Sequence, residues 1–391
     1  MAFSFADHKA PMLAGVVASI TGTAASTGVV LAALTALGAS HNQIISVVFS
    51  MLILYGVLSM VLSWRYKMPL SIVWSTPGAA LLVSAGALNY GFETAVGAFI
   101  MAAALIALTG LWPTLGRLVT SIPKPIASAM LAGVIFSFCI APFQALVALP
   151  IVMAPVLLVW LVLYKYATVW ATPVSMVLLF TLIAFQQHIT IAADQIWPSV
   201  AFVVPNFSVS AIISIGIPLY LVTMASQNIP GIAIMKSFGY EVPFKPVMLA
   251  TGFGSLVFNF VGGFVTNLAA ITAALNANEH AHKDPKRRWL ASFYGGIVYL
   301  ILAAATGAML SFVMQAPHEI VLAGAGLALF GTIVGAFTSI VEEPKLRLPA
   351  VIAFLVASSG MALFSVGPAF WALTAGVLVW RWLEFRANRD A

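Results

Sequence analysis

The chain of 391 residues is 62% hydrophobic and only 7% charged, and its mean hydropathy is +1.06. Soluble domains contain about 25% charged residues, so this composition excludes an ordinary soluble fold and indicates a protein that spans a membrane. The formal net charge is +6, but no basic stripe is interleaved with aromatic residues, so nucleic acid is not an expected partner.

Fourteen apolar segments can be placed in chain order. A helix needs about 20 apolar residues to cross a bilayer, and several of the segments only just reach that length. The first segment is too long for the apolar region of a signal peptide, so we predict that it is an uncleaved span. The expected segments lie at about 12–37, 42–63, 70–88, 92–112, 123–146, 149–165, 167–187, 209–236, 246–261, 262–277, 288–311, 317–338, 347–365 and 367–385.

The Lys and Arg residues predict how these segments are oriented. They form eight clusters, and each gap between clusters has room for two crossings, so all 17 bases fit on one side of the membrane. Cytoplasmic loops are where Lys and Arg accumulate, so both termini are expected in the cytoplasm. The opposite loops hold no Lys or Arg, only Glu93, Asp194, Glu319 and some His. The clusters are Lys9, Arg65 and Lys67, Arg117 and Lys124, Lys165, Lys236 and Lys245, Lys283 to Arg288, Lys345 and Arg347, and Arg381 to Arg389.

The two halves of the chain, 1–200 and 201–391, look like copies of one unit of seven segments. Three short matches occur in the same order at offsets of 190 to 200 residues, pairing Pro123 with Pro317, Ser26 with Ser226, and Thr76 with Thr266. Seven is an odd number, so the second copy must enter the membrane from the opposite face. The predicted fold is therefore an all-α integral membrane protein with 14 transmembrane segments in a 7+7 inverted repeat.

Segments 70–88 and 262–277 are predicted to be broken, each with a short extended stretch followed by a half-helix. In the first, Ser75 or Thr76 supplies a helix N-cap and Pro77 occupies the first helical position, followed by Gly78. In the second, paired glycines precede Thr266 or Asn267 as the cap. Both half-helix N-termini would point into one cavity and favour an anion there. The alternative is that Pro77 kinks a packed span whose hydroxyl groups bond to their own helix.

Segment 209–236 carries the most polar patch inside any predicted span, with Gln227 and Asn228 beside Pro230. Amide side chains within hydrocarbon need partners, and proline removes a backbone hydrogen bond nearby. We interpret the patch as part of a binding site. The alternative is that these amides join neighbouring helices.

The acids and the reactive residues exclude several classes of function. No Asp or Glu lies near the centre of a predicted span, which disfavours a cation transporter and favours an anionic substrate. No metalloprotease, nucleophile-elbow or phosphate-loop motif is present, so no catalytic residues are assigned and an integral membrane enzyme is the least favoured class. Cys139 is the single cysteine, and His280 and His282 fit a solvated loop, so neither a metal site nor a cofactor is expected.

Two polar motifs carry a resemblance to a known family. At Trp74-Ser-Thr-Pro-Gly-Ala-Ala-Leu-Leu82 and Met224-Ala-Ser-Gln-Asn-Ile-Pro-Gly231, the chain resembles the benzoate:proton symporter (BenE) family of bacterial inner membranes. The similarity extends through 123–133, 269–274 and 284–290, and so covers essentially the whole chain. That family looks like a relative of the uracil permease and sulfate permease fold, which has seven plus seven inverted segments.

The resemblance implies a carrier in the bacterial inner membrane that imports benzoate or a similar aromatic carboxylate with protons by alternating access. A core domain, from 12–112 and 209–311, would move against a gate domain, from 123–187 and 317–385. Nucleobase permeases of this fold use acids in segments 8 and 10, which this chain lacks. The implied substrate-binding residues are Ser75, Thr76, Pro77, Gly78, Gln227, Asn228, Thr266 and Asn267, and Trp74, Met224 or Phe264 would face the aromatic ring.

Three alternatives stay open beside this interpretation. In a passive anion channel, helix N-termini would attract the anion in the same way. The fold also suits a carrier of another small anion or of a nucleobase. The expected partners are the aromatic carboxylate, protons and membrane lipid. The sequence does not set the oligomeric state, and a homodimer is one alternative.

Overall fold

A computed structural model describes residues 5–112, 114–115, 121–187, 197–269, 271–313, 315, 317–363 and 366–387. Arg117, Asp194, Ala270 and Arg389 lie outside these ranges. The described part of the first half contains, in order, α1 (Phe5–Ala36), α2 (His41–Tyr66), β1 (Ile72–Trp74), α3 (Thr76–Ala85), η1 (Gly86–Leu88), α4 (Phe92–Leu111), α6 (Lys124–Ala148), α7 (Pro150–Tyr166) and α8 (Thr168–Gln187).

The second half repeats this order of long helices around one short strand. It contains α9 (Val209–Ala211), η3 (Ile212–Gly216), α10 (Ile217–Thr223), η4 (Met224–Asn228), α11 (Ile229–Ser237), α12 (Phe244–Asn259), β2 (Thr266–Leu268), α13 (Ile271–Ala277), η5 (Pro285–Arg287), α14 (Trp289–Ala304), α15 (Thr306–Val313), α16 (His318–Glu342), η6 (Pro344–Leu346), α17 (Arg347–Ser358) and α18 (Pro368–Ala387).

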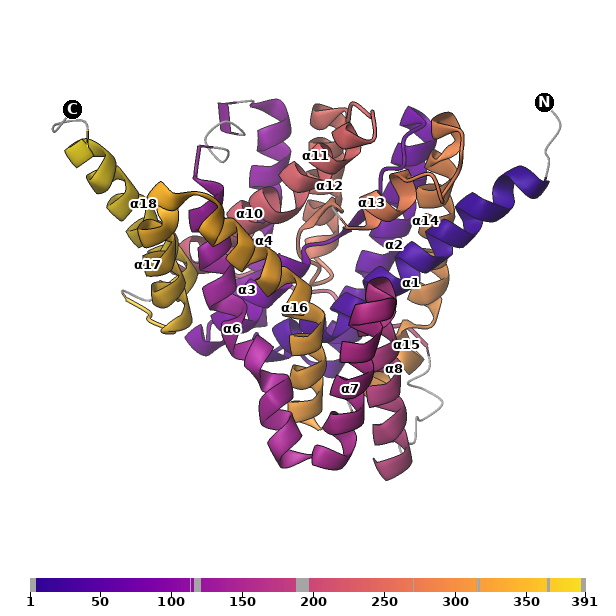
Figure 1. Ribbon diagram of the computed structural model, residues 1–391, viewed down its shortest axis with the longest axis horizontal. Coiled ribbons are helices and arrows are strands. Elements are labelled where there is room, and N and C mark those ends of the chain that lie inside the picture. Colours follow the sequence, from indigo (N-terminus) through magenta and orange to yellow (C-terminus); the bar gives the residue numbers. More distant parts are fainter. Residues whose placement is uncertain are drawn as a thin grey trace.

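The apolar segments expected from the sequence coincide with these elements to within a few residues at most boundaries. The largest differences are that α1 begins earlier, at Phe5, and that α17 ends earlier, at Ser358. Among the described residues, six helices are long and apolar enough to cross a membrane, and three shorter apolar helices accompany them. In Figure 1 the start of α1 and the end of α18 lie along the same edge of the molecule, as an even number of crossings would place them.

The helices pack in two groups. In one, α14 lies against α1 and α2, α12 lies against α4, and α3 lies against α1. In the other, α6 lies between α16 and α17, and α7 and α8 pack against each other and against their neighbours at the lower edge of Figure 1. Small residues permit the close approaches. A Cβ added to Gly15 of α1 would lie 2.1 Å from the carbonyl oxygen of Ala291 on α14, so only glycine fits there.

The outer surface carries large apolar side chains. Helix α7 buries only Val152, Met153 and Val156, whereas Leu158 and Leu161 are 62% and 61% exposed. A water-soluble surface does not present such continuous apolar faces, but a hydrocarbon environment accommodates them at no cost.

The two broken segments meet as an antiparallel ribbon. Strands β1 and β2 pair in the register Ile72↔Leu268, Val73↔Asn267 and Trp74↔Thr266. The backbone bonds continue beyond the strands, because Ser75 N–H donates to Val265 O at 3.3 Å and Ala269 N–H donates to Ser71 O at 2.9 Å. Extended backbone at membrane depth requires this kind of internal pairing. The prediction that segments 70–88 and 262–277 are broken is therefore confirmed.

One detail of that prediction is wrong. Thr266 and Asn267 do not cap a helix; they lie in β2, and α13 begins later, at Ile271. The reason is that Thr266 and Asn267 pair with β1, which extends the strand past the expected cap. The structural offset between the repeats is 194 residues, from Ile72 to Thr266 at the strand starts and from Lys124 to His318 at the starts of α6 and α16. The Pro123–Pro317 match has this offset, and the Thr76–Thr266 match does not.

The span from Val209 to Ser237 contains two π-helical turns, η3 and η4, each followed two residues later by a proline. The wider turns are visible in the bonds from Ile217 N–H to Ile212 O and from Ile229 N–H to Met224 O. A proline cannot donate and its ring clashes with the carbonyl four residues earlier, so Pro218 and Pro230 favour the wider turn. The polar patch of the sequence lies in η4.

Candidate functional site

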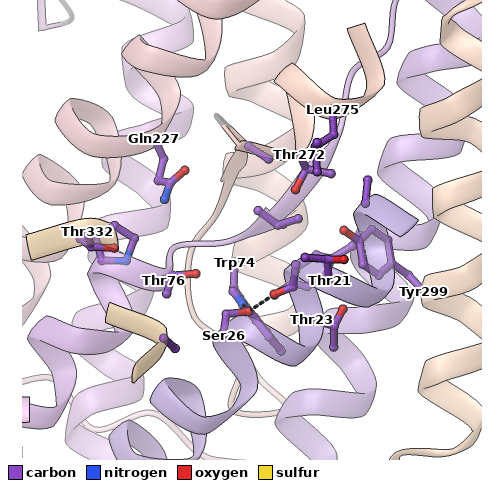
Figure 2. A pocket seen from close by; sticks show the side chains of 17 residues that line it. Thr21, Thr23, Ser26, Trp74, Thr76, Gln227, Thr272, Leu275, Tyr299 and Thr332 are labelled. Atoms are coloured by element: carbon purple, nitrogen blue, oxygen red, sulfur yellow. Dashed lines mark hydrogen bonds between the residues drawn. The ribbon is translucent and has the colours of Figure 1, made fainter. Parts of the chain in front are cut away.

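A cavity of about 150 Å³ lies where the β1–β2 ribbon and the N-terminus of α3 meet α1, η4, α13, α14 and α16. Four of the eleven predicted site residues line it: Trp74, Thr76, Pro77 and Gln227. Figure 2 shows Thr76, Gln227 and Thr332 at one end of the cavity, with Trp74 between them and the opposite end. The structure therefore brings together residues from both repeats.

The N-terminus of α3 is held in place by Ser75. The Ser75 hydroxyl accepts from Gly78 N–H at 3.1 Å and from the Thr223 hydroxyl at 2.9 Å, and Ser75 is fully buried. Thr76 and Pro77 then occupy the first helical turn and face the cavity. Gly78 allows α10 to approach, because an added Cβ would lie 2.6 Å from Leu219 Cδ1. Ser75 and Gly78 thus fix the position of the N-terminus of α3, and Thr76 and Pro77 of that N-terminus face the cavity.

Trp74 forms an aromatic wall with a fixed orientation. Its indole N–H donates to the Ser26 hydroxyl at 2.7 Å, and that hydroxyl donates to Gly22 O at 2.7 Å on α1. The ring of Tyr55 stands edge-on to Trp74, with centroids 5.5 Å apart and an interplanar angle of 86°. Edge-to-face contacts of this kind hold aromatic rings in one arrangement.

Asn228 is adjacent to Gln227 in the chain, but its side chain lies in different surroundings. It is fully buried, and its Oδ1 accepts from Leu268 N–H at 2.9 Å, which joins η4 to β2. Its Nδ2 donates to the sulfur of Met224 at 3.3 Å, and Met224 is buried in the same packing. Neither Asn228 nor Met224 lines the cavity.

The predicted residues of the second broken segment are also buried away from the cavity. The Thr266 hydroxyl contacts the Ser255 hydroxyl at 3.0 Å and donates to Thr251 O at 3.2 Å, which fixes β2 to α12. Asn267 Nδ2 donates to Val73 O at 3.4 Å. Phe264 packs against Phe99 with centroids 6.2 Å apart. These side chains brace the ribbon.

Sequence reasoning missed much of the cavity lining. Helix α1 contributes Thr21, Thr23 and Ser26, and the opposite wall includes Tyr55 and Tyr299, with Thr272 of α13 and Thr332 of α16 nearby. A signal was present, because the first predicted span carries five hydroxyl residues between Ser19 and Thr27. The two tyrosines gave no comparable signal, since single tyrosines in apolar spans are ordinary packing residues.

The cavity surface is mostly apolar, and the polar groups on it are uncharged. Among the described residues, no Asp, Glu, Lys, Arg or His lines it, and no three His, Cys, Asp or Glu side chains approach closely enough to hold a metal ion. Three lining hydroxyl groups, on Thr21, Tyr55 and Tyr299, are buried without a hydrogen-bond partner. Buried polar groups are nearly always paired, so unpaired ones around one cavity indicate that a polar ligand or water completes them.

Comparison with known proteins places the chain in a family. The profile of the benzoate membrane transport protein family, BenE, matches residues 6–381. The chain belongs to the BenE family. It is 36% identical over 381 residues to the Inner membrane protein YdcO of Escherichia coli (strain K12), covering 97% of each chain. It is 33% identical over 352 residues to the Benzoate membrane transport protein of Acinetobacter baylyi (strain ATCC 33305 / BD413 / ADP1), covering 87% of this chain and 86% of that one.

Solved structures show the same fold at low sequence identity. The transmembrane domain of the cyanobacterial bicarbonate transporter BicA matches with a TM-score of 0.60 and 15% identity, covering 96% of this chain and 98% of that one. SLC26A9 matches with a TM-score of 0.58 and 15% identity, covering 96% of this chain and 65% of that one. These domains have the 7+7 inverted-repeat fold, which confirms the predicted fold class. This BenE family member is a membrane transport protein and not an enzyme.

Proposed function

We propose that this protein is a secondary transporter that imports benzoate or a similar aromatic carboxylate together with protons across the bacterial inner membrane. Its membership of the BenE family supports a transported benzoate-like anion. One observation carries the proposal: the cavity combines an aromatic wall with uncharged polar groups beside a helix N-terminus, at a volume of about 150 Å³. A cavity of roughly 150 Å³ holds a benzene ring.

The carboxylate binds at the end of the cavity formed by Thr76, Gln227 and Thr332 (Figure 2). Helix α3 starts there and is ten residues long, and a helix N-terminus carries the equivalent of about half a positive charge. Helix α13 has only seven residues and contributes the Thr272 side chain rather than a second helix dipole. Ser75, Gly78, Asn228, Thr266 and Asn267 act indirectly, by holding α3, η4 and β2 in position.

The proton travels on the substrate. Since no carboxylate or imidazole of the described residues lines the cavity, and tyrosine hydroxyl groups ordinarily stay protonated near neutral pH, the group that carries the proton is the carboxyl group of the substrate itself. Transfer into a site of low dielectric raises the pKa of that carboxyl group against the opposing effect of the α3 N-terminus, and so favours uptake of a proton with the anion. An acidic exterior and an alkaline interior then drive inward transport.

Transport proceeds by alternating access between a core domain, 12–112 and 209–311, and a gate domain, 123–187 and 317–385. The walls from α1, α3, η4, α13 and α14 belong to the core, and Ala328 and Thr332 of α16 belong to the gate. Gly331 and Gly335 lie on the exposed outer face of α16, where an added Cβ would have no atoms within 4 Å, so that face of α16 makes no contact with the core. Sliding of α16 along the core would open the cavity first to one side and then to the other.

Uptake into proteoliposomes tests the proposal. Vesicles containing the purified protein should accumulate labelled benzoate when their interior is made alkaline, and an uncoupler should abolish the accumulation. Excess unlabelled benzoate inside should accelerate entry of labelled benzoate, because a carrier shows this trans-stimulation and a pore does not. Uracil competing as well as benzoate, or uptake without saturation, would overturn the proposal.

A further inference from the structure

The end of the cavity opposite the proposed carboxylate site has a composition of its own. Figure 2 shows Thr21 and Tyr299 there, well separated from Thr76 and Gln227. Tyr55 stands beside them, with its ring centroid 5.8 Å from that of Tyr299. Tyr55 and Tyr299 are 1% and 2% exposed, so neither hydroxyl reaches bulk solvent.

All three hydroxyl groups at this end lack a hydrogen-bond partner. The Ser19 hydroxyl lies beside that of Tyr299, and the Trp74 backbone lies beside the Tyr55 hydroxyl, but neither contact has hydrogen-bond geometry. Another buried tyrosine, Tyr220, is paired, because its hydroxyl contacts the Thr109 hydroxyl at 2.6 Å. Buried hydroxyl groups without a partner also occur away from the cavity, at Ser175 and Ser339. The cavity end differs from those positions in that three such groups line the same space.

We propose that Thr21, Tyr55 and Tyr299 form a subsite for a hydroxyl group on the aromatic ring, so that the preferred substrate is a hydroxybenzoate. This inference rests on the proposed function and narrows its substrate class. Unsubstituted benzoate would displace water from this end and leave three buried hydroxyl groups unpaired. A site built to bond a substrate hydroxyl discriminates strongly against the analogue that lacks it, for this reason.

The geometry also selects the position of the hydroxyl group. The carboxylate lies at the Thr76 end and the subsite lies at the opposite end, with Trp74 between them (Figure 2). A hydroxyl group meta or para to the carboxylate can reach the subsite across the ring. A hydroxyl group in the ortho position stays beside the carboxylate and gains nothing there.

Calorimetric titration of the purified protein tests the subsite. The ligands are benzoate, the three hydroxybenzoates, and the 3- and 4-methylbenzoates as apolar analogues of similar size. Either 3- or 4-hydroxybenzoate should bind about tenfold tighter than benzoate and than its methyl analogue, since an unpaired buried hydroxyl is costly. The ortho isomer should bind no tighter than benzoate. An ortho isomer that gains as much as the others, or hydroxy and methyl analogues that bind equally, would overturn the inference.

Variants separate the subsite from a general effect on the cavity. Tyr299→Phe and Tyr55→Phe should each weaken the preferred hydroxybenzoate about tenfold and tighten benzoate, because the ring wall is kept and one unpaired hydroxyl is removed. Tyr220→Phe is the matched control, a buried tyrosine outside the cavity, and should change neither affinity. Equal weakening of both ligands by Tyr299→Phe would contradict the subsite.

The outcomes distinguish the two proposals. If benzoate binds but a ring hydroxyl adds no affinity, the subsite fails and the proposed function stands. If folded protein, verified by an unchanged melting transition, binds none of the aromatic carboxylates, the proposed function fails as well.

Discussion

The two broken segments are built alike but contribute differently to the cavity. Each has a three-residue strand followed by a half-helix, and the strands pair with each other. The first segment places Trp74, Thr76 and Pro77 on the cavity surface. The second places Ala269, Thr272 and Leu275 there, and keeps Thr266 and Asn267 buried away from the cavity. The inverted repeat therefore supplies a symmetric frame, but the polar residues of the two strand ends have different roles: those of the first segment face the cavity and those of the second brace the ribbon.

The difference has a local cause in how each half-helix is fixed. Helix α3 is fixed at its start, by the Ser75 cap and Pro77. Helix α13 is shorter and is fixed at its end, where Arg288 Nη1 donates to Ala277 O at 2.7 Å. Arg288 is 5% exposed and its Nε donates to His282 O at 2.7 Å, so it is a rigid clamp. One half-helix presents a defined N-terminus to the cavity, and the other is anchored from outside it.

The largest expected effect concerns the orientation of the two segments. In a background with buried Cys139 replaced by Ala, we expect Ala87→Cys, after α3, to react with an impermeant thiol reagent in intact cells. We expect Glu279→Cys, after α13, to react only after permeabilisation, because the base distribution places that loop in the cytoplasm with both termini. Both positions are exposed. Labelling of both from the same side would refute the inverted arrangement.

Asn228→Leu should produce the largest loss of stability. The substitution keeps the branched shape of the side chain but leaves Leu268 N–H unpaired in a fully buried position, at a cost of about 2 to 3 kcal/mol. The melting temperature of the detergent-solubilised protein should therefore fall clearly below that of the parent. Gln227→Leu, one residue away, is the matched control and should melt close to the parent. Equal melting temperatures for the two variants would show that the bond from Leu268 to Asn228 does not support the fold.

Gln227→Leu should instead act on binding. If the Gln227 amide donates to the substrate carboxylate, its loss removes a hydrogen bond to a charged group, worth about 2 kcal/mol, or roughly thirtyfold in affinity. Titration calorimetry with benzoate measures the change. An affinity equal to that of the parent would remove Gln227 from the carboxylate site.

Much of this arrangement could be predicted from the sequence because its signals are local. The Ser75–Pro77 order specifies a helix start, and the base clusters and apolar lengths specify the spans. Pro230 beside Gln227 and Asn228 marked η4 as irregular. Such signals depend on residues adjacent in the chain, which is why the fold was recognisable.

The division of roles between adjacent polar residues could not be predicted. Gln227 faces the cavity and Asn228 faces β2 because successive residues of a helix point in different directions, and the packing of η4 decides which of them meets the cavity. The local sequence predicts a helix cap at Thr266, because no local signal shows that β1, almost 200 residues earlier, pairs with it. Tyr55 and Tyr299 meet only in the folded protein.

A matched pair of Thr→Val substitutions compares the two broken segments directly, although the expected effects are the smallest of those predicted. Thr266→Val removes the hydroxyl that contacts Ser255 and Thr251, and should lower the free energy of unfolding by about 1 kcal/mol while affinity for benzoate changes little. Thr76→Val removes a hydroxyl that faces the cavity, and should weaken benzoate by about fivefold with little effect on melting temperature. The shape of the side chain is the same in both, so only the surroundings of the hydroxyl differ. If Thr266→Val weakened binding as much as Thr76→Val, the strand end of the second broken segment would contribute to the binding surface as directly as that of the first, and the proposed asymmetry would be wrong.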